Sequence, residues 1–430
     1  MRYNRGVPLV SALLAYVAFA LLLPVLLLHP KIRRGLRQRL GLYRGDPLRG
    51  ASGPRVWLHG ASAGDLLSLL PIATELERLR PDARLVVSTI TNTGALMAAR
   101  RFPRATCIYA PYDLPGATRR AMAAHKPDLL VLEYTEIWPA LIRAARGAGA
   151  RVALTNGRFG EGNLARYRLL FALTGNPLRS LELLLMREEV EAERARALGA
   201  DPSRVRVTGN TKFDALLLSV PDRDDEALAS ALGLASRPPA LVAGSTHEGE
   251  EAILLDVFRT LRADVPELKL VLAPRYIDRA PRVVALAKSR GFRVALRSAD
   301  AAGVAEVLVL DTIGELTAAY RLATLVFVGG SFTARGGQNI LEPAACGKPV
   351  LFGPRMENFR DSVQVLVGRG GIQVKDGAAL AKVAGELLAR PAQLQELGEL
   401  ARAAVSNVRG ASATNAALLA ALLPPPAGRA

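Results

Sequence analysis

The chain has 430 residues, half of them hydrophobic, and a formal net charge of +17 at pH 7. This length exceeds one ordinary domain and suits two α/β domains of about 180 residues each. The excess of cations indicates an anionic partner. Because the sequence has no zinc-finger spacing, helix-turn-helix signature or RNA-binding aromatic motif, we expect an anionic membrane surface and no nucleic acid. Its two cysteines, Cys107 and Cys346, lie far apart, so no disulfide framework and no cysteine-based metal site is expected.

The first 45 residues predict a membrane anchor followed by a basic segment. Residues 7–28 carry no charge over 22 positions, enough for a helix to cross roughly 30 Å of hydrocarbon. Residues 31–39 then supply five cations and no acid, which indicates an uncleaved anchor rather than a signal peptide. These cations place the rest of the chain on the cytoplasmic side. Pro24 and the modest length leave two alternatives open, a helix lying in the membrane interface and a buried core helix.

From residue 55 onward, short apolar runs alternate with helical patterns, which is typical of parallel βαβ units. Residues 46–218 are expected to form one Rossmann-like domain, and residues 226–423 repeat the pattern in a second. Residues 219–225 are the expected linker, and residues 424–428 are expected to form a disordered tail. The expected strands are 56–59, 85–88, 129–132, 152–154, 183–186 and 205–210 in the first domain, and 240–243, 268–272, 307–310, 325–328 and 349–352 in the second.

The fold class that follows is α/β, with two Rossmann-like domains facing a central cleft behind an N-terminal membrane-anchor helix. Ligands of doubly wound sheets bind at the carboxyl ends of the strands. Every loop of this chain that carries unusual polar residues follows an expected strand. We therefore expect the active site in the cleft, with residues from both domains.

The most informative loop spans residues 329–347, between an expected strand and an expected helix. Its four glycines before Gln338 allow close approach of a ligand to the backbone. Gln338 and Asn339 are expected at the helix N-terminus, where free N–H groups and the helix dipole attract an anion. Glu342 follows Asn339 by three residues, on the same face of the first turn. The loop therefore predicts a nucleotide-sugar site, with amides for the phosphate and a carboxylate for ribose hydroxyls; a plain Gly-rich turn is the alternative.

The other polar loops supply groups suited to glycosyl transfer. Asp65 opens a helix and can take the proton of an acceptor hydroxyl as it attacks a sugar's anomeric carbon. Lys212 and Arg275 can stabilise negative charge on a departing nucleotide. With only four histidines in the chain, and with the carboxylates of residues 222–224 in the linker, no metal or other cofactor is expected. The loops are 59–65, 133–139, 208–214, 243–251, 273–275 and 311–316.

In this order and behind an N-terminal anchor, these loops resemble those of the 3-deoxy-D-manno-octulosonic acid (Kdo) transferases, inverting glycosyltransferases of the two-Rossmann-domain (GT-B) type. The resemblance runs from about residue 30 to about residue 375, and its motifs in the second half are the more specific. It implies transfer of Kdo from CMP-Kdo to a lipid A precursor in lipopolysaccharide inner-core synthesis. The implied partners are a CMP-activated sugar donor and a phosphorylated glycolipid acceptor, and the implied location is the cytoplasmic side of the cell inner membrane.

The same resemblance assigns the acceptor to the first domain and the nucleotide sugar to the second. Asp65 occupies the position of the family's catalytic base, and Lys212 matches a residue that stabilises the transition state. Glu136 matches an acid on the acceptor side. The residues expected to bind the CMP donor are Ser245, Pro274, Arg275, Ile313, Gly314, Glu315, Asn339, Ile340, Leu341 and Glu342.

Some positions depart from the family's pattern. Asp65 replaces the usual Glu and is one methylene shorter, and Ile313 replaces the usual Met. Tyr134 stands where a second functional Glu is usual, with Glu133 and Glu136 nearby; in an extended stretch Glu133 would point to the opposite side from Tyr134. Two further hypotheses therefore stay open. One is the same fold with a different donor, such as a UDP-hexosamine, or a different acceptor; the other is a membrane-bound nucleotide-sugar binder without catalysis.

Overall fold

A computed structural model describes residues 16–17, 19–21, 34–46, 48, 50, 52–217, 225–299 and 305–425. The predicted anchor, residues 7–28, lies outside the described residues except for two short pieces, and so do most of the predicted linker and tail. Within the described ranges, no helix is long and apolar enough to cross a membrane.

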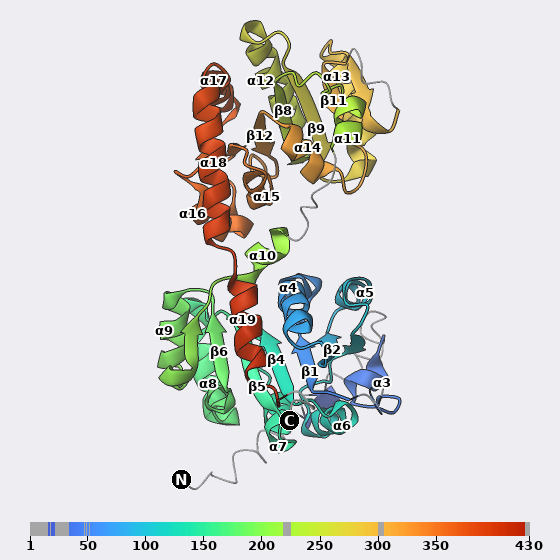
Figure 1. Cartoon of the computed structure of the whole chain (residues 1–430), viewed down its shortest axis with the longest axis vertical. Helices are drawn as coiled ribbons and strands as arrows, with labels where there is room; N and C mark the ends of the chain where they lie inside the picture. Colours follow the sequence, from blue (N-terminus) through green and yellow to red (C-terminus); the bar gives the residue numbers. More distant parts are fainter. Residues whose placement is uncertain are drawn as a thin grey trace. The chain divides into compact units, whose positions relative to one another are not determined.

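The chain divides into two compact units (Figure 1). The N-terminal unit contains the described residues up to Ala215 together with those from Gly410 onward, and the C-terminal unit runs from Leu216 to Arg409. Each unit is built on one parallel sheet of seven strands. The α/β class and the two Rossmann-like sheets expected from the sequence are thus confirmed.

The sheet of the N-terminal unit has the doubly wound order β3-β2-β1-β4-β5-β6-β7. Its strands are β1 (Arg55–His59), β2 (Arg84–Thr89), β3 (Thr106–Tyr109), β4 (Leu129–Glu133), β5 (Arg151–Gly157), β6 (Leu183–Met186) and β7 (Val205–Val207). The helices are α3 (Leu36–Arg39), α4 (Ala63–Leu79), α5 (Asn92–Arg101), α6 (Pro115–His125), α7 (Pro139–Gly147), α8 (Leu164–Thr174), α9 (Glu189–Ala197), α10 (Thr211–Leu217) and α19 (Ala411–Ala420).

Alternate residues of these strands enter two hydrophobic cores, one on each face of the sheet. Trp57 and Leu130 belong to the core under α6, α7 and α9, whereas Leu58 and Val131 belong to the core under α4, α5 and α19. Strands buried on both faces appear in the sequence as continuous apolar runs. This is why the central strands could be recognised without an alternating pattern.

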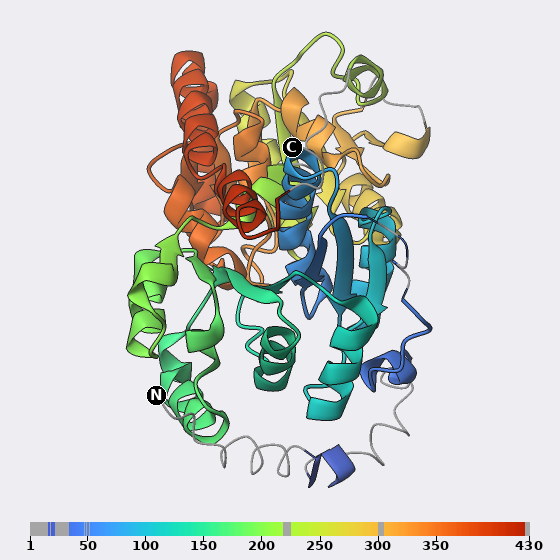
Figure 2. The same cartoon turned by 60° about the horizontal axis from the view of Figure 1, so that its bottom comes forward.

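Helix α19 corrects the predicted boundary of the second domain, which extended to residue 423. Ala416 and Leu419 are completely buried in a core that they share with α4, and both cartoon views show α19 beside α4 (Figures 1 and 2). The backbone N–H groups of Gly410 and Ser412 donate to the Asp214 carboxylate at 2.9 and 2.7 Å. The last helix therefore completes the N-terminal unit, although it follows the C-terminal unit in sequence.

The sheet of the C-terminal unit has the order β10-β11-β9-β8-β12-β13-β14. Its strands are β8 (Ala240–Thr246), β9 (Lys269–Pro274), β10 (Val294–Leu296), β11 (Val307–Val309), β12 (Leu325–Val328), β13 (Val350–Phe352) and β14 (Gly371–Gln373). The helices are α11 (Glu226–Ala231), α12 (Glu250–Asp264), α13 (Ala280–Ser289), α14 (Leu316–Leu322), α15 (Leu341–Ala345), α16 (Arg360–Leu366), α17 (Gly377–Leu388) and α18 (Pro391–Asn407).

Both sheets reverse their winding direction at one pair of neighbouring strands. These pairs are β1 and β4 in the N-terminal unit and β8 and β12 in the C-terminal unit. The chain leaves the two strands of such a pair in opposite directions, which opens a crevice at their carboxyl ends where ligands bind. The loops after these four strands are therefore the first places to look for a site.

Candidate active site

Asp65 lies at the start of α4, where the helix cap fixes its side chain. The backbone N–H and the hydroxyl of Ser62 donate to Asp65 Oδ2 at 2.8 and 3.0 Å, and the Asp65 N–H donates to Ser62 Oγ at 3.4 Å. This is a capping box with Asp in place of the more usual Glu or Gln. Both bonds to the Asp65 carboxylate go to Oδ2, and Oδ1 accepts no hydrogen bond from any described residue. Burial raises the pKa of Asp65, and the nearby charge of Glu136 adds to this rise, whereas the hydrogen bonds from Ser62 lower the pKa. The raised pKa makes the carboxylate a better base.

His59, the last residue of β1, faces Glu136 beside this carboxylate. His59 Nδ1 lies 2.8 Å from Ser88 Oγ, and Nε2 lies 3.5 Å from Glu136 Oε2. Trp138 Nε1 donates to the same Glu136 oxygen at 2.6 Å. Because a carboxylate only accepts, this arrangement favours a His59 tautomer protonated on Nε2. His59 and Glu136 both act on the charge of Asp65, so the three side chains form one electrostatic cluster.

Glu133, at the end of β4, is a completely buried acid with two hydrogen-bond donors. Thr155 Oγ1 donates to one of its oxygens at 2.6 Å and Asn156 Nδ2 to the other at 2.5 Å. Burial raises the pKa of Glu133 to about 8, so the group is largely protonated at neutral pH. Asn156 Oδ1 also accepts from the Thr211 N–H at 2.9 Å, which ties β5 to the start of α10. The sequence identifies Glu133 as a residue after a strand but does not predict this network, because its donors Thr155 and Asn156 lie 22 and 23 residues away in the chain.

Tyr134 does not continue β4 as an extended residue. Its φ of 54° turns the backbone into the left-handed region, and its Oη lies 3.3 Å from Ser68 Oγ on α4. The guanidinium of Arg187 lies 6.0 Å from its ring centroid. The expectation that Glu133 and Tyr134 point to opposite sides assumed an extended stretch, and the backbone turn removes that assumption.

Lys212 lies in the first turn of α10 with an exposed side chain. Its backbone N–H donates to Asn210 Oδ1 at 3.0 Å, which caps the start of that helix. The ammonium group therefore extends from a fixed backbone at the carboxyl end of β7.

In the C-terminal unit, the Gly-rich loop after β12 is held by the buried carboxylate of Glu250. One Glu250 oxygen accepts from the N–H groups of His247 and Gly330 at 2.8 and 2.7 Å, and the other accepts from Ser331 and Phe332 at 3.0 and 2.9 Å. The side chain therefore links the start of α12 to the loop after β12. A run of acids at a strand-to-helix turn was the only signal in the sequence.

Two separate structural constraints require glycine in this loop. Gly330, Gly336 and Gly337 have φ values of 68°, 76° and 82°, which favour glycine. Gly329 has no such φ, but a Cβ there would come within 2.8 Å of Glu250 Oε2. The sequence analysis attributed these glycines to a ligand, whereas at Gly329 the close neighbour belongs to the protein itself.

The start of α15 also differs from the prediction. The helix begins at Leu341 and has only five residues, so Asn339 precedes it. Asn339 Oδ1 accepts from the Leu341 N–H at 3.1 Å. This N–H is therefore occupied, and the N–H groups of Gly330 to Phe332 are occupied by Glu250. The Leu341 amide, at the first position of the helix, is therefore not free to bind a phosphate.

Glu342 lies in the single turn of α15 and is partly buried. Thr317 Oγ1, from α14, donates to its carboxylate, and burial raises the pKa of Glu342. Ile340 and Leu341, its neighbours in the predicted donor segment, are at most 1% exposed. They can shape the backbone of the segment but not contact a ligand with their side chains.

The other predicted donor residues follow β8, β9 and β11. Ser245, near the end of β8, has a left-handed φ of 55°. Pro274 ends β9, and the guanidinium of the exposed Arg275 lies 5.7 Å from the Tyr276 ring centroid. Beside this loop the buried Glu251 accepts two bonds from Arg279, at 2.7 and 3.1 Å.

After β11, Ile313 is 89% exposed and Gly314 has a φ of 90°. Glu315 accepts from the Arg297 guanidinium at 3.0 Å and from the Thr312 hydroxyl. The turn is thus fixed by its acid and presents an apolar side chain to solvent.

Every sequence-predicted site residue therefore lies in the last residues of a strand of its own unit, in the loop that follows a strand, or in the first turn of the next helix. The structure brings Asp65 and Glu136 into one cluster with His59, which the sequence analysis did not assign a role. Among the described residues, no group of His, Cys, Asp and Glu is arranged to hold a metal ion.

Two solved structures share this fold. The UDP-GlcNAc 2-epimerase of Neisseria meningitidis aligns with a TM-score of 0.56 at 14% identity, over 85% of this chain and 99% of its own. The HepE protein of Anabaena, solved with UDP, aligns with a TM-score of 0.54 at 14% identity, over 86% of this chain and all of its own. The fold is that of the GT-B class.

Sequence relatives then specify the family. A family model described as 3-deoxy-D-manno-octulosonic-acid transferase (kdotransferase) matches residues 34–215. The transferase of that name from Bordetella pertussis is 33% identical over 83% of this chain and 85% of its own length, and the one from Chlamydophila psittaci is 32% identical over 84% and 83%. The chain belongs to the 3-deoxy-D-manno-octulosonic acid transferase family of glycosyltransferases.

Proposed function

We propose that this chain transfers Kdo from CMP-Kdo to a lipid A precursor with inversion at the anomeric carbon, in lipopolysaccharide inner-core synthesis. The observation that carries the proposal is the similarity to curated Kdo transferases over more than four-fifths of the chain, which includes both units. The polar residues at the strand ends of each unit provide the chemistry.

Asp65 is the proposed base. Its Oδ2 is fixed by Ser62, and Oδ1 is available for the proton of an acceptor hydroxyl. As that proton moves to Asp65, the hydroxyl oxygen attacks the anomeric carbon of Kdo and the bond to the CMP phosphate oxygen breaks. General-base catalysis of this kind contributes about 100- to 10,000-fold in rate. The capping bonds supply the orientation that a shorter side chain needs.

Glu136 is the proposed acceptor-side acid, with His59 as its positioning partner. Trp138 and His59 approach the same Glu136 oxygen, so its other oxygen can accept from a sugar hydroxyl. The negative charge of Glu136 also raises the pKa of Asp65. The acid therefore both orients the acceptor and keeps the base basic.

Lys212 and Arg275 are proposed to stabilise the negative charge that develops on CMP. Both side chains are exposed, Lys212 in the first turn of α10 and Arg275 just after β9, so a bound anion can reach them. Glu342 is proposed to hold the ribose, since a carboxylate accepts from two adjacent hydroxyls. Ser245, Pro274, the turn of residues 313–315 and residues 339–341 complete the proposed CMP site, mainly through their backbone.

We also propose that residues 7–28 attach the protein to the cytoplasmic face of the inner membrane. The uncharged 22-residue stretch and the five cations after it support this proposal. The cations would favour anionic lipid and would bring the active site to a lipid-embedded acceptor.

The function is tested by incubating the full chain with tetra-acylated lipid A precursor and CMP-Kdo generated in situ, with products read by mass spectrometry. A mass increase of one or more Kdo residues is expected, and the Asp65→Ala variant serves as the inactive control. Turnover only with a UDP-hexosamine would replace the donor assignment. Binding of CMP without any transfer would identify a non-catalytic nucleotide-sugar binder.

A further inference from the structure

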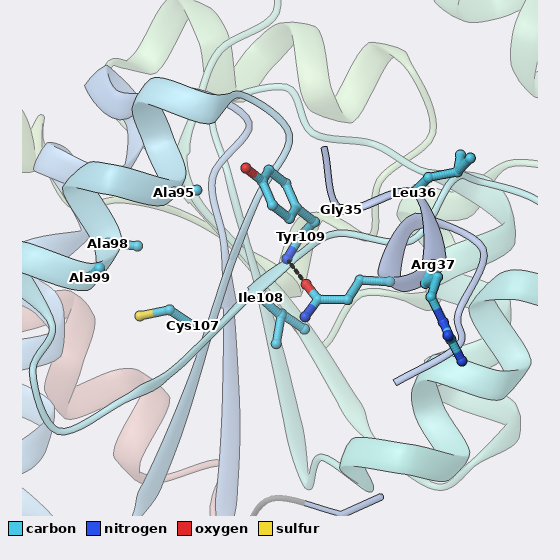
Figure 3. A pocket seen from close by; sticks show the side chains of 10 residues that line it. Gly35, Leu36, Arg37, Ala95, Ala98, Ala99, Cys107, Ile108 and Tyr109 are labelled. Carbon is cyan, nitrogen blue, oxygen red and sulfur yellow. Dashed lines mark hydrogen bonds between the residues drawn. The ribbon is translucent and has the colours of Figure 1, made fainter. Parts of the chain in front are cut away.

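A pocket of about 490 Å³ lies in the N-terminal unit between α5, β3 and the segment that follows the predicted anchor (Figure 3). This volume lies in the range of sites that hold small organic ligands. None of the residues assigned above to the acceptor, the base or the nucleotide lines it. Its walls are residues 35–38, three alanines of α5 and residues 107–109 of β3.

The lining of the pocket is mainly apolar, and small side chains keep it open. Ala95, Ala98 and Ala99 share one face of α5, because they are spaced by three and four residues. Figure 3 shows them across from the Cys107 thiol, with the Tyr109 ring on the same side of β3 as α5. A larger apolar residue at any of the three alanines would occupy the space. The pocket suits a narrow apolar group.

The outer wall is fixed rather than loosely placed. Gln38 Oε1 accepts from the Tyr109 N–H at 2.8 Å, at the outer edge of the sheet. Arg39 is 3% exposed, donates to the Ile90 carbonyl at 2.5 Å, and lies 4.6 Å from the Tyr109 ring centroid. Gly35 has a φ of 72°, and a Cβ there would lie 2.1 Å from that ring. These contacts hold the segment against β3, so the pocket exists before any ligand arrives.

Charge and chain connectivity identify the kind of ligand. Arg34 and Arg37 are exposed at this wall, within a run of five cations and no acid, which suits a ligand that also carries phosphate. Gly35 follows Leu28, the end of the predicted anchor, by seven residues, which span at most about 25 Å when extended. Strand β3 lies two strands from β1, or about 10 Å. An apolar group in the pocket can therefore belong to the same molecule as a sugar near Asp65.

We infer that this pocket binds one acyl chain of the phosphorylated glycolipid acceptor. The inference rests on the proposed function, because it names the part of the acceptor that the apolar pocket holds. The acyl chain then sets the distance between the membrane and the acceptor hydroxyl. The enzyme thereby selects an acylated acceptor over the bare phosphorylated disaccharide.

The Cys107 thiol in the pocket wall provides a direct test that needs no turnover. The full chain carrying Cys346→Ser, in a fixed concentration of nonionic detergent, is alkylated with N-ethylmaleimide, and modification of Cys107 is followed by mass spectrometry. Tetra-acylated lipid A precursor should slow the reaction at least fivefold in a saturable manner. The same disaccharide bisphosphate without acyl chains should leave the rate unchanged. Equal protection by both compounds would overturn the inference. Slow alkylation that the glycolipid does not alter would also overturn it, because it would mean that residues of the protein itself fill the pocket.

A pair of variants on α5 links the pocket to catalysis. Ala99→Leu fills the pocket, whereas Arg100→Leu changes an exposed neighbour that does not line it. Ala99→Leu should raise the KM for the tetra-acylated acceptor about tenfold and abolish thiol protection, with kcat and the KM for CMP-Kdo unchanged. Arg100→Leu should behave as wild type in all four. An unchanged acceptor KM in Ala99→Leu, or the same rise in both variants, would contradict the inference. Thiol protection without any transfer would refute the proposed function alone.

Discussion

Glu250 gives the sharpest prediction about the C-terminal unit, because one buried carboxylate accepts four backbone N–H groups. In Glu250→Gln the amide oxygen keeps two of these bonds, while the amide nitrogen, itself a donor, faces the other two N–H groups. A buried donor without an acceptor costs about 1–3 kcal/mol, so the variant should lose roughly 2–6 kcal/mol of local stability. The shape of the side chain is preserved, so the loss reports hydrogen bonding rather than a cavity.

Hydrogen exchange followed by mass spectrometry measures this effect locally. Peptides that contain Gly330 to Phe332 should exchange faster in Glu250→Gln by the factor that corresponds to this free energy, and the affinity for CMP should fall because the loop after β12 loosens. The matched control is Glu248→Gln, an exposed acid in the same turn, which should change stability by less than about 0.5 kcal/mol. Exchange of these amides at the wild-type rate in Glu250→Gln would refute the assignment of Glu250 as the acceptor that holds the loop.

The remaining predictions concern the base, the nucleotide, pH and the membrane. Asp65→Ala should lower the transfer rate about 100- to 10,000-fold with CMP affinity within a few-fold of wild type, while Asp65→Glu stays active; wild-type turnover of the Ala variant would exclude this base. Arg275→Ala and Glu342→Ala should each weaken CMP binding by about 1–3 kcal/mol in calorimetry, and unchanged affinity in both would place the nucleotide elsewhere. The pKa of Glu133 is about 4.5 in the unfolded chain and about 8 in the fold, so the native state binds the extra proton and the free energy of unfolding should fall as pH rises between these values. Urea titrations at pH 5 and pH 8 should show a smaller fall in Glu133→Gln than in the wild type. An equal fall in both proteins would contradict this role of Glu133. Deleting residues 1–29 should leave a folded protein that binds anionic vesicles at low salt and has low activity on a lipid acceptor. A truncated protein that aggregates in every detergent-free buffer would indicate that residues 1–29 pack into the core of the first domain.

The strands missing from the sequence analysis are β3, β10 and β14, and all three are edge strands. Central parallel strands are apolar on both faces, as in Leu129–Glu133, so their runs stand out. An edge strand such as Thr106–Tyr109 has intermediate exposure at three of its four positions, and its composition does not separate it from a loop. The fold class could therefore be predicted from composition and order, but the width of each sheet could not.

The candidate site divides in a similar way. Asp65 could be identified from its place after an apolar strand and at the start of a helix, and Glu136 from the family resemblance; both act in one electrostatic cluster in the structure. The roles of Glu250 and Glu133 could not be predicted, because they depend on donors that are distant in the chain, such as Gly330 for Glu250 and Asn156 for Glu133. The acceptor that the Leu341 N–H already has in Asn339 also could not be predicted, because a sequence does not show which N–H groups are paired.

The position of α19 in the core of the N-terminal unit has a consequence for how the protein is made. Roughly 200 residues separate Ala215 from Gly410, and at about 5–20 residues per second a ribosome needs about 10–40 seconds to synthesise them. Throughout that time the apolar surface of α4 that Ala416 and Leu419 later cover stays exposed on the emerging chain. Most of the N-terminal unit is thus translated first, but its core can be completed only at the end of synthesis. A chain that stops at residue 409 would contain the whole C-terminal unit and an N-terminal unit without its last helix.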